Sequence, residues 1–361
     1  MLTRAPAAER PTPSLPVRRQ HGRPHWMQNP WVDAGVALAW VPFVVALHLA
    51  ENDPALLRAL ISATFLLSFA HQPLTLALVY GDGEQFRLRR AVFTLSPLIF
   101  AVAIVIVTRF DPLVLAIVAG AWNAEHTLMQ RYGITRIYGR KVGQDDGRLE
   151  KLMLFSWLAL AVVVVAGDGR TPGRLTQMGL GDTNRLAVEA LTRFRSAASL
   201  LAVPVALVVA ALVVVWWRSE WRAGAGANSA KWVYVGTTAL LFLVILVDPI
   251  AGLMGYVGAH AIEYFVIVHQ SLGRRYADGA SGQASALGRA VRARPGRAGF
   301  LAAYLGVVLA LVTLLQWYGS VMAYLVVFFT LGGLHVFYDG FIWKLRRPAV
   351  AQSLDLPAAA L

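Results

Sequence analysis

Long runs of apolar residues, separated by loops rich in arginine, constrain this chain more than any other feature of its sequence. Many of these runs hold about 18 to 25 mostly apolar residues, the length that crosses roughly 30 Å of hydrocarbon. Hydrophobic residues fill 57% of the 361 positions and charged residues only 15%, too few to cover a water-soluble protein of this size. The sequence therefore predicts an all-α fold, a polytopic transmembrane helical bundle. The runs are too long, and alternate too little, for a transmembrane β-barrel.

The positions of the runs predict about ten membrane spans. The spans cover residues 31–50, 55–80, 91–108, 113–133, 152–167, 196–217, 232–249, 251–272, 300–317 and 319–343. Alternate loops are basic, and the opposite loops are short or of mixed charge apart from 168–195, which holds five arginines. Because Lys and Arg accumulate in cytoplasmic loops, both termini are expected in the cytoplasm, and the membrane is expected to be a bacterial inner membrane.

The chain divides into three predicted regions. Residues 1–30 contain arginines and prolines but no apolar core, so we interpret them as a disordered basic cytoplasmic tail and not as a signal peptide. Residues 31–347 form the transmembrane helical domain, and residues 348–361 form a short cytoplasmic tail.

The net charge of +13 is typical of nucleic-acid-binding proteins, but here the arginines sit between apolar spans. That distribution favours anionic membrane lipids as partners and indicates no nucleic acid. Cysteine is absent, which excludes disulfides, thiolate metal sites and cysteine nucleophiles. No HExxH, GxSxG or Walker motif is present.

Histidine is concentrated in the predicted spans. Six of the eight histidines fall inside them: His48, His71, His126, His260, His269 and His335. An ionisable side chain at membrane depth is costly, on the order of 2.5–3.5 kcal/mol for a central charge, and therefore indicates a functional site. Five of the six come to similar depth in the even-numbered spans, whereas His48 lies at the outer end of the first span beside Glu51.

Two carboxylates lie one helical turn from a histidine. His260 and Glu263 are three residues apart, and His335 and Asp339 are four apart, so each pair shares a helix face. Such a carboxylate can ligate a metal or orient the histidine. Without thiolates, the donor set suits non-haem iron, with manganese or zinc as alternatives, and one or two ions. The predicted metal ligands are His71, His126, His260, Glu263, His269 and His335, with Glu125 and Asp339 as catalytic or orienting carboxylates.

Structural roles are the alternative for each of these residues. A lone intramembrane histidine such as His48 is ordinarily a hydrogen-bond partner between helices. His71 precedes a proline at position 73, and its ring could satisfy a carbonyl freed by the kink. The two histidine–carboxylate pairs could be structural ion pairs. We interpret the neighbouring aromatic residues, Tyr264 among them, as an interfacial belt.

These isolated histidines, with HxxE at 260–263 and HxxxD at 335–339, resemble the sites of histidine-rich membrane iron oxygenases, nearest in style to the bacterial β-carotene-cleaving oxygenases. The resemblance implies oxygen-dependent oxidation (cleavage, hydroxylation or desaturation) of a lipophilic small molecule, with O2 as co-substrate. Two other hypotheses stay open. A proton- or cation-coupled transporter would use the same residues as a relay, and a bis-histidine haem protein would use two of them as axial ligands.

Overall fold

The computed structural model describes residues 25–110, 112–171, 173, 185–277 and 284–356, and in these the regular secondary structure is entirely helical. The prediction of an all-α chain is confirmed. Most of the predicted tail at 1–30, part of the 168–195 segment and the last five residues lie outside the described residues.

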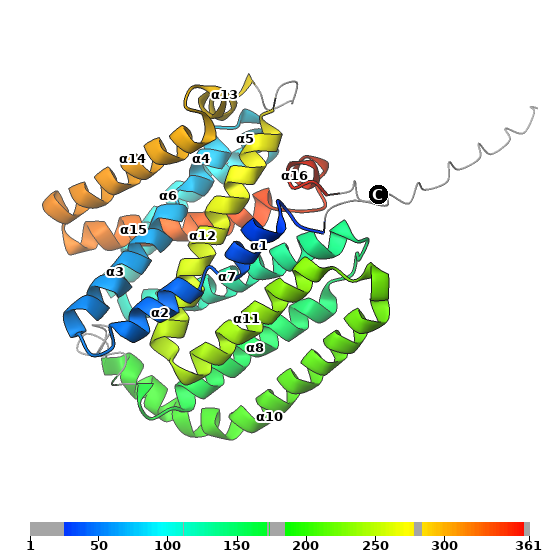
Figure 1. Cartoon of the computed structure of the whole chain (residues 1–361). Helices are drawn as coiled ribbons and strands as arrows, with labels where there is room; N and C mark the ends of the chain where they lie inside the picture. Colours follow the sequence, from blue (N-terminus) through cyan, green and yellow to red (C-terminus); the bar gives the residue numbers. More distant parts are fainter. Residues whose placement is uncertain (1–24, 111, 172, 174–184, 278–283, 357–361) are drawn as a thin grey trace, which may run out of the picture.

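The helices follow one another along the chain as labelled in Figure 1. They are α1 (Pro30–Ala37), α2 (Val41–Leu49), α3 (Pro54–His71), α4 (Leu74–Tyr80), α5 (Gly83–Leu88), α6 (Arg90–Phe110), α7 (Pro112–Lys141), α8 (Arg148–Gly167), α10 (Arg185–Ala223), α11 (Ser229–Val247), α12 (Pro249–Arg275), α13 (Ala286–Arg292), α14 (Gly296–Tyr318), α15 (Val321–Ile342) and α16 (Pro348–Ser353), with a 3₁₀ turn at Gly224–Gly226.

Helix α12 is the centre of the bundle. In Figure 1 it runs between a group formed by α3, α6, α14 and α15 and a group formed by α8, α10 and α11. In its apolar stretch 72% of the residues are buried, against 11% in α10 and in α14. One hydrophobic core, which includes Leu128 and Phe242, reaches α12 at Ala259; a second, which includes Leu74 and Leu334, reaches it at Tyr264. The residues between these two points are therefore enclosed by both halves.

Within the described residues, eight helical segments are long and apolar enough to cross a membrane, or nine if the bent pair α1 and α2 counts as one span. Large apolar side chains on α10 and α14 point outward, with Leu200 78% and Val307 70% exposed. Apolar surface on this scale is stable in lipid and not in water, so the chain has the build of an integral membrane protein. The predicted span at 113–133 falls in α7, which is long enough but polar in its second half.

The second predicted span is broken at Gln72 and Pro73, between α3 and α4. Proline has no N–H to donate, so a helix that contains it leaves a carbonyl group without its usual partner. His71 does not fill that role. The carbonyl of Phe69, four residues before Pro73, instead accepts from the N–H of Gln72 at 3.1 Å, and the hydroxyl of Tyr304, on α14, donates to the next carbonyl, that of Ala70, at 2.6 Å.

The predicted tail at 348–361 begins with an ordered helix. Val350 and Ala351 of α16 are buried, as is Leu354 just after it, in a core that also contains Ile267 of α12. Asp355 forms an ion pair with Lys141 at 3.4 Å. The described part of this segment therefore belongs to the packed bundle.

A buried ion cluster ties the ends of three helices together. Nζ of Lys231, on α11, contacts Glu150 of α8, and lies 2.6 Å from Glu220 of α10 and 2.7 Å from Oε1 of Gln144. Lys231 is fully buried, and both carboxylates are only 6% exposed. The single ammonium group therefore compensates two carboxylates in a poorly solvated place.

A second ion pair lies at the start of α5. Asp82 is fully buried and accepts hydrogen bonds from Nε of Arg275 and from the hydroxyl of Tyr276, both at 2.7 Å. Burial alone would raise the pKa of Asp82, but the hydrogen bonds and the guanidinium charge outweigh burial and hold this pKa below its ordinary value.

Replacing Lys231 should destabilise the fold strongly. Lys231→Met leaves Glu150 and Glu220 buried without a counter-charge, and loss of one partner of a buried ion pair typically costs about 3–5 kcal/mol. We expect a large drop in the melting temperature of the detergent-solubilised protein, with recovery when Glu150→Gln and Glu220→Gln are added. Arg148→Ala, which breaks an exposed pair with Asp146, is the control. A Lys231→Met melting temperature equal to wild type would contradict this account.

Asp82 should make stability depend on acid pH. Because the folded-state pKa lies below the unfolded value of about 3.9, its contribution is complete above that pH and is lost as the pH falls through the folded pKa. We expect Asp82→Asn to melt earlier than wild type near pH 7, and the two melting temperatures to converge as the pH falls below about 4. A difference that stayed constant with pH would show that the carboxylate charge is not the cause.

Candidate metal centre

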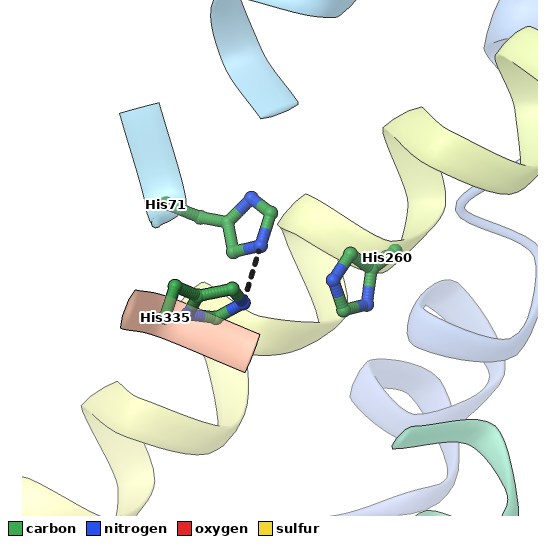
Figure 2. Close-up of side chains that lie close together, drawn as sticks. All are labelled: His71, His260 and His335. Atoms are coloured by element: carbon green, nitrogen blue, oxygen red, sulfur yellow. Dashed lines mark hydrogen bonds between the residues drawn. The ribbon is translucent and has the colours of Figure 1, made fainter. Parts of the chain in front are cut away.

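Four of the predicted ligands meet inside the bundle, each from a different helix. His71 is the last residue of α3, and His126, His260 and His335 lie within α7, α12 and α15. Nε2 of His335 is 3.1 Å from Nε2 of His71 and 3.0 Å from Nε2 of His126. Figure 2 shows His71, His260 and His335 gathered from three helices, with a dashed line at the short contact.

The four rings pack edge to face. The ring centroids of His71 and His260 are 4.6 Å apart, those of His126 and His260 5.1 Å, and those of His126 and His335 4.7 Å, with interplanar angles of 82° to 89°.

The hydrogen-bonding capacity of this cluster is not satisfied by protein groups. In the part of the chain that the structure describes, neither ring nitrogen of His260 has a hydrogen-bond partner, although the residue is fully buried. An imidazole nitrogen offers one in-plane position, either an N–H or a lone pair. Nε2 of His335 therefore cannot bond well to both His71 and His126. A cation is attracted to several nitrogen lone pairs at once, so the donor set fits a metal ion.

Asp339 is held beside the cluster by two hydroxyl groups. Its Oδ1 accepts hydrogen bonds from Oγ1 of Thr75 at 2.9 Å and from the hydroxyl of Tyr264 at 3.1 Å. Oγ1 of Thr75 is also 2.7 Å from Nδ1 of His335 and 2.5 Å from the Tyr264 hydroxyl. Oδ2 of Asp339 lies 3.8 Å from Nε2 of His126.

Glu263 faces an arginine. Its Oε1 is 2.8 Å from Nη2 of Arg131, and both side chains are fully buried. Nε2 of Gln130 donates to Oε2 of Glu263 at 3.1 Å and to the carbonyl of His260 at 3.0 Å. The charge of Glu263 is therefore compensated by Arg131 without a metal, and its position beside His260 is fixed through Gln130.

The structure does not bring the remaining predicted residues into the cluster. His269 follows His260 by nine residues, which places it on the other side of α12, where it is half-buried. Glu125 points about 100° away from its neighbour His126 around α7. His48 lies at an exposed site and pairs with Glu51 at 3.4 Å.

Three residues of the site, Arg131, Tyr264 and Thr75, are absent from the site that the sequence predicted. Arg131 and Glu263 are opposite charges in two predicted spans, and the rule that such charges pair would have found them. Tyr264, interpreted as part of an interfacial belt, is buried and bonds to Asp339. Thr75 gave no signal, because an intramembrane threonine ordinarily bonds to its own helix, as Thr64 does to the carbonyl of Leu60.

Comparison of the chain with protein-family models, curated proteins and solved structures gives no significant match. The residues of the site are four imidazoles, one hydrogen-bonded carboxylate and one neutralised ion pair.

Breaking the ion pair beside the cluster should unfold the centre of the bundle. Glu263→Gln leaves the Arg131 guanidinium buried without a counter-charge, which we expect to cost about 3–5 kcal/mol. Adding Arg131→Met to this variant should restore much of the loss, because the unpaired charge is then removed. Chemical unfolding in mixed micelles measures both effects, with Glu51→Gln at the exposed His48 pair as control. Losses that simply add in the double variant would exclude the coupling.

Proposed function

We propose that this protein is an integral-membrane, metal-dependent oxidoreductase that holds non-haem iron and uses O2 to oxidise a lipophilic small molecule. The observation that carries the proposal is the meeting of His71, His126 and His335 through Nε2 atoms 3.0 and 3.1 Å apart, with His260 unpartnered against them. The resemblance to histidine-rich membrane oxygenases, and to the bacterial β-carotene-cleaving enzymes in particular, is part of this proposal.

The nitrogen separations support a shared metal ion. Nε2 of His335 lies 3.1 Å from Nε2 of His71 and 3.0 Å from Nε2 of His126, close enough for one ion to bind these nitrogens together. Imidazole nitrogens with a neighbouring carboxylate and no thiolate suit iron, with manganese or zinc as alternatives.

The contacts favour one ion over two. His71, His260 and His335 form one group of possible ligands, and His126, His335 and Asp339 form another. Both groups need His335. Its Nε2 faces the other histidines, while its Nδ1 is engaged with Thr75 at 2.7 Å. A single ion bound to Nε2 of His335 can therefore draw its other ligands from either group, with His71 and His260 on one side and His126 on the other.

The protein supplies the ligands and a dry interior. The four histidines are between 0 and 8% exposed, so bulk water is kept from the centre. Iron held there would supply the binding and activation of O2. Asp339 is the one carboxylate beside the cluster that is not paired with a cation, and its Oδ2 is directed towards His126 and His335. Asp339 is therefore the group placed to hold a proton at the centre, whereas Glu125 and Glu263 face elsewhere.

The geometry favours this function over the other two hypotheses. Axial ligands on opposite sides of one haem iron would be about 4 Å apart with a flat macrocycle between them, and the imidazole nitrogens here are closer. A transport relay needs polar groups that continue across the bilayer. Instead, these four histidines form one buried cluster.

The proposed topology counts α7 as a membrane span, in addition to the helical segments that are long and apolar enough to cross a membrane. With α1 and α2 as one span, the total is ten, and both termini then lie on one side. We assign that side to the cytoplasm of a bacterial inner membrane, because Lys231, Arg275 and Arg347 lie at helix ends that would face it.

Metal analysis of the purified protein tests the centre. We expect about one iron per chain after supplementation with Fe²⁺, and loss of most of that metal in the separate variants His71→Ala, His126→Ala, His260→Ala and His335→Ala. His269→Ala should keep it, which makes this variant a control for a histidine of the same membrane domain. Wild-type protein without stoichiometric metal, or metal retained in all four variants, would exclude the metal centre.

Oxygen uptake tests the reaction class. Iron-loaded wild-type protein in nanodiscs should consume O2 when an apolar lipid extract is added, and His335→Ala should not. Metal-loaded protein that never consumes O2 with any lipophilic extract would exclude an oxygenase while leaving the metal centre in place.

A further inference from the structure

We infer that Thr75 is a positioning residue that fixes which nitrogen of His335 faces the metal. This inference rests on the metal centre proposed above but not on the reaction class. Thr75 is fully buried, and its hydroxyl contacts His335, Asp339 and Tyr264 at once. Among the described residues, the Thr75 hydroxyl forms no hydrogen bond with His71, His126 or His260. Its effect on the metal centre is therefore exerted through its contact with His335.

The direction of each hydrogen bond follows from the number of protons. Thr75 has one hydroxyl proton, and that proton is donated to Oδ1 of Asp339, the carboxyl oxygen that also accepts from Tyr264. The 2.7 Å contact between Oγ1 of Thr75 and Nδ1 of His335 must then have the histidine as donor. His335 therefore carries its proton on Nδ1, and its Nε2 has a free lone pair.

That lone pair faces the cluster. Nε2 of His335 is the atom that lies within 3.1 Å of the Nε2 atoms of His71 and His126. In the opposite tautomer, an Nε2–H group would point among the other histidines and hydrogen-bond to one of them, and the ligand atom would be lost. Asp339 thus fixes the orientation of the Thr75 hydroxyl, and that hydroxyl accepts from Nδ1 of His335. A hydrogen-bonded arrangement of this kind holds a metal-binding imidazole in one tautomer.

The helix break puts Thr75 in this position. The break at Gln72 and Pro73 separates α3 from α4, and His71 and Thr75 on its two sides both reach His335. The hydroxyl of Tyr264, 2.5 Å from Oγ1 of Thr75 and 3.1 Å from Oδ1 of Asp339, packs this arrangement against α12. The oxygen of Thr75 accepts from His335 while its proton is donated to Asp339, and the single hydroxyl proton of Tyr264 is shared between Oγ1 of Thr75 and Oδ1 of Asp339.

The test compares variants that differ in the hydroxyl group alone. Thr75→Ala and Thr75→Ser differ only by that group, and Thr75→Val keeps the volume of threonine without it. The dissociation constant for Fe²⁺ or Co²⁺ is measured by competition with a chelator in detergent-purified protein. Removing such an outer partner typically weakens metal binding 10- to 100-fold, so we expect this loss in Thr75→Ala and Thr75→Val and near-wild-type affinity in Thr75→Ser.

Two further measurements separate positioning from packing. The Co²⁺ ligand-field spectrum should change in Thr75→Ala and Thr75→Val and stay like wild type in Thr75→Ser, because only the first two free the imidazole to rotate or change tautomer. Thr64→Val is the matched control, since Thr64 is also a buried threonine of the same broken span but bonds to its own backbone. It should bind metal as wild type does.

The outcomes distinguish this inference from the proposed function. Equal affinity in wild type, Thr75→Ala and Thr75→Val would overturn the role of Thr75 and leave the metal centre intact. Equal weakening in Thr75→Ser and Thr75→Ala would also overturn it, because the hydroxyl would not be what matters. Wild-type protein that binds neither ion would overturn both. Metal binding with the expected pattern but no O2 uptake would support Thr75 and overturn the oxygenase alone.

Discussion

The cost of a polar group without a partner inside an apolar bundle governs this structure. Water is not available there to satisfy an orphan nitrogen or carboxylate, so each must find a protein partner or an ion. Glu263 has Arg131, Lys231 has two glutamates, and Asp339 has two hydroxyl groups. The clustered histidines differ: among the described residues, Nδ1 of His71 and both ring nitrogens of His260 have no hydrogen-bond partner, and Nε2 of His335 is contacted by two other imidazoles. Their unsatisfied nitrogens are the reason to place a cation among them.

Helix α12 and the broken span α3–α4 build the centre together. Within about one turn, α12 provides three residues of the site. His260 belongs to the histidine cluster, Glu263 forms the ion pair with Arg131, and the hydroxyl of Tyr264 bonds to Asp339. The break at Pro73 lets His71 and Thr75 approach His335 from the two parts of one span. A straight helix would give residues four apart a common face but a fixed offset along its axis. The interruption at Gln72 and Pro73 lies between these two residues, so a local change in the backbone contributes to the geometry of the site.

Residue spacing and burial cost predicted part of this site. His335 and Asp339 share a face of α15, as their spacing indicated, and the five histidines of the even-numbered spans include the four that meet. His269 was indistinguishable from them in sequence, because depth in the bilayer says nothing about which way a ring points around its helix. Glu263 has the spacing from a histidine that is expected of a metal ligand, but it forms an ion pair with Arg131 on another helix. Thr75 could not be singled out, since the partner that gives its hydroxyl a role lies about 260 residues away.

The amino-acid sequence by itself determined that the chain is helical, that it is built for a membrane and that six of its eight histidines fall within the predicted spans. Those properties follow from the length of apolar runs and the position of charges, which are local along the chain. Only the tertiary structure decided which four imidazoles face one another, which carboxylate is neutralised by arginine and which is held by hydroxyl groups. These depend on the rotation of each helix about its axis and on contacts between distant segments, because the packing of the bundle, and not the span pattern, sets how side chains converge.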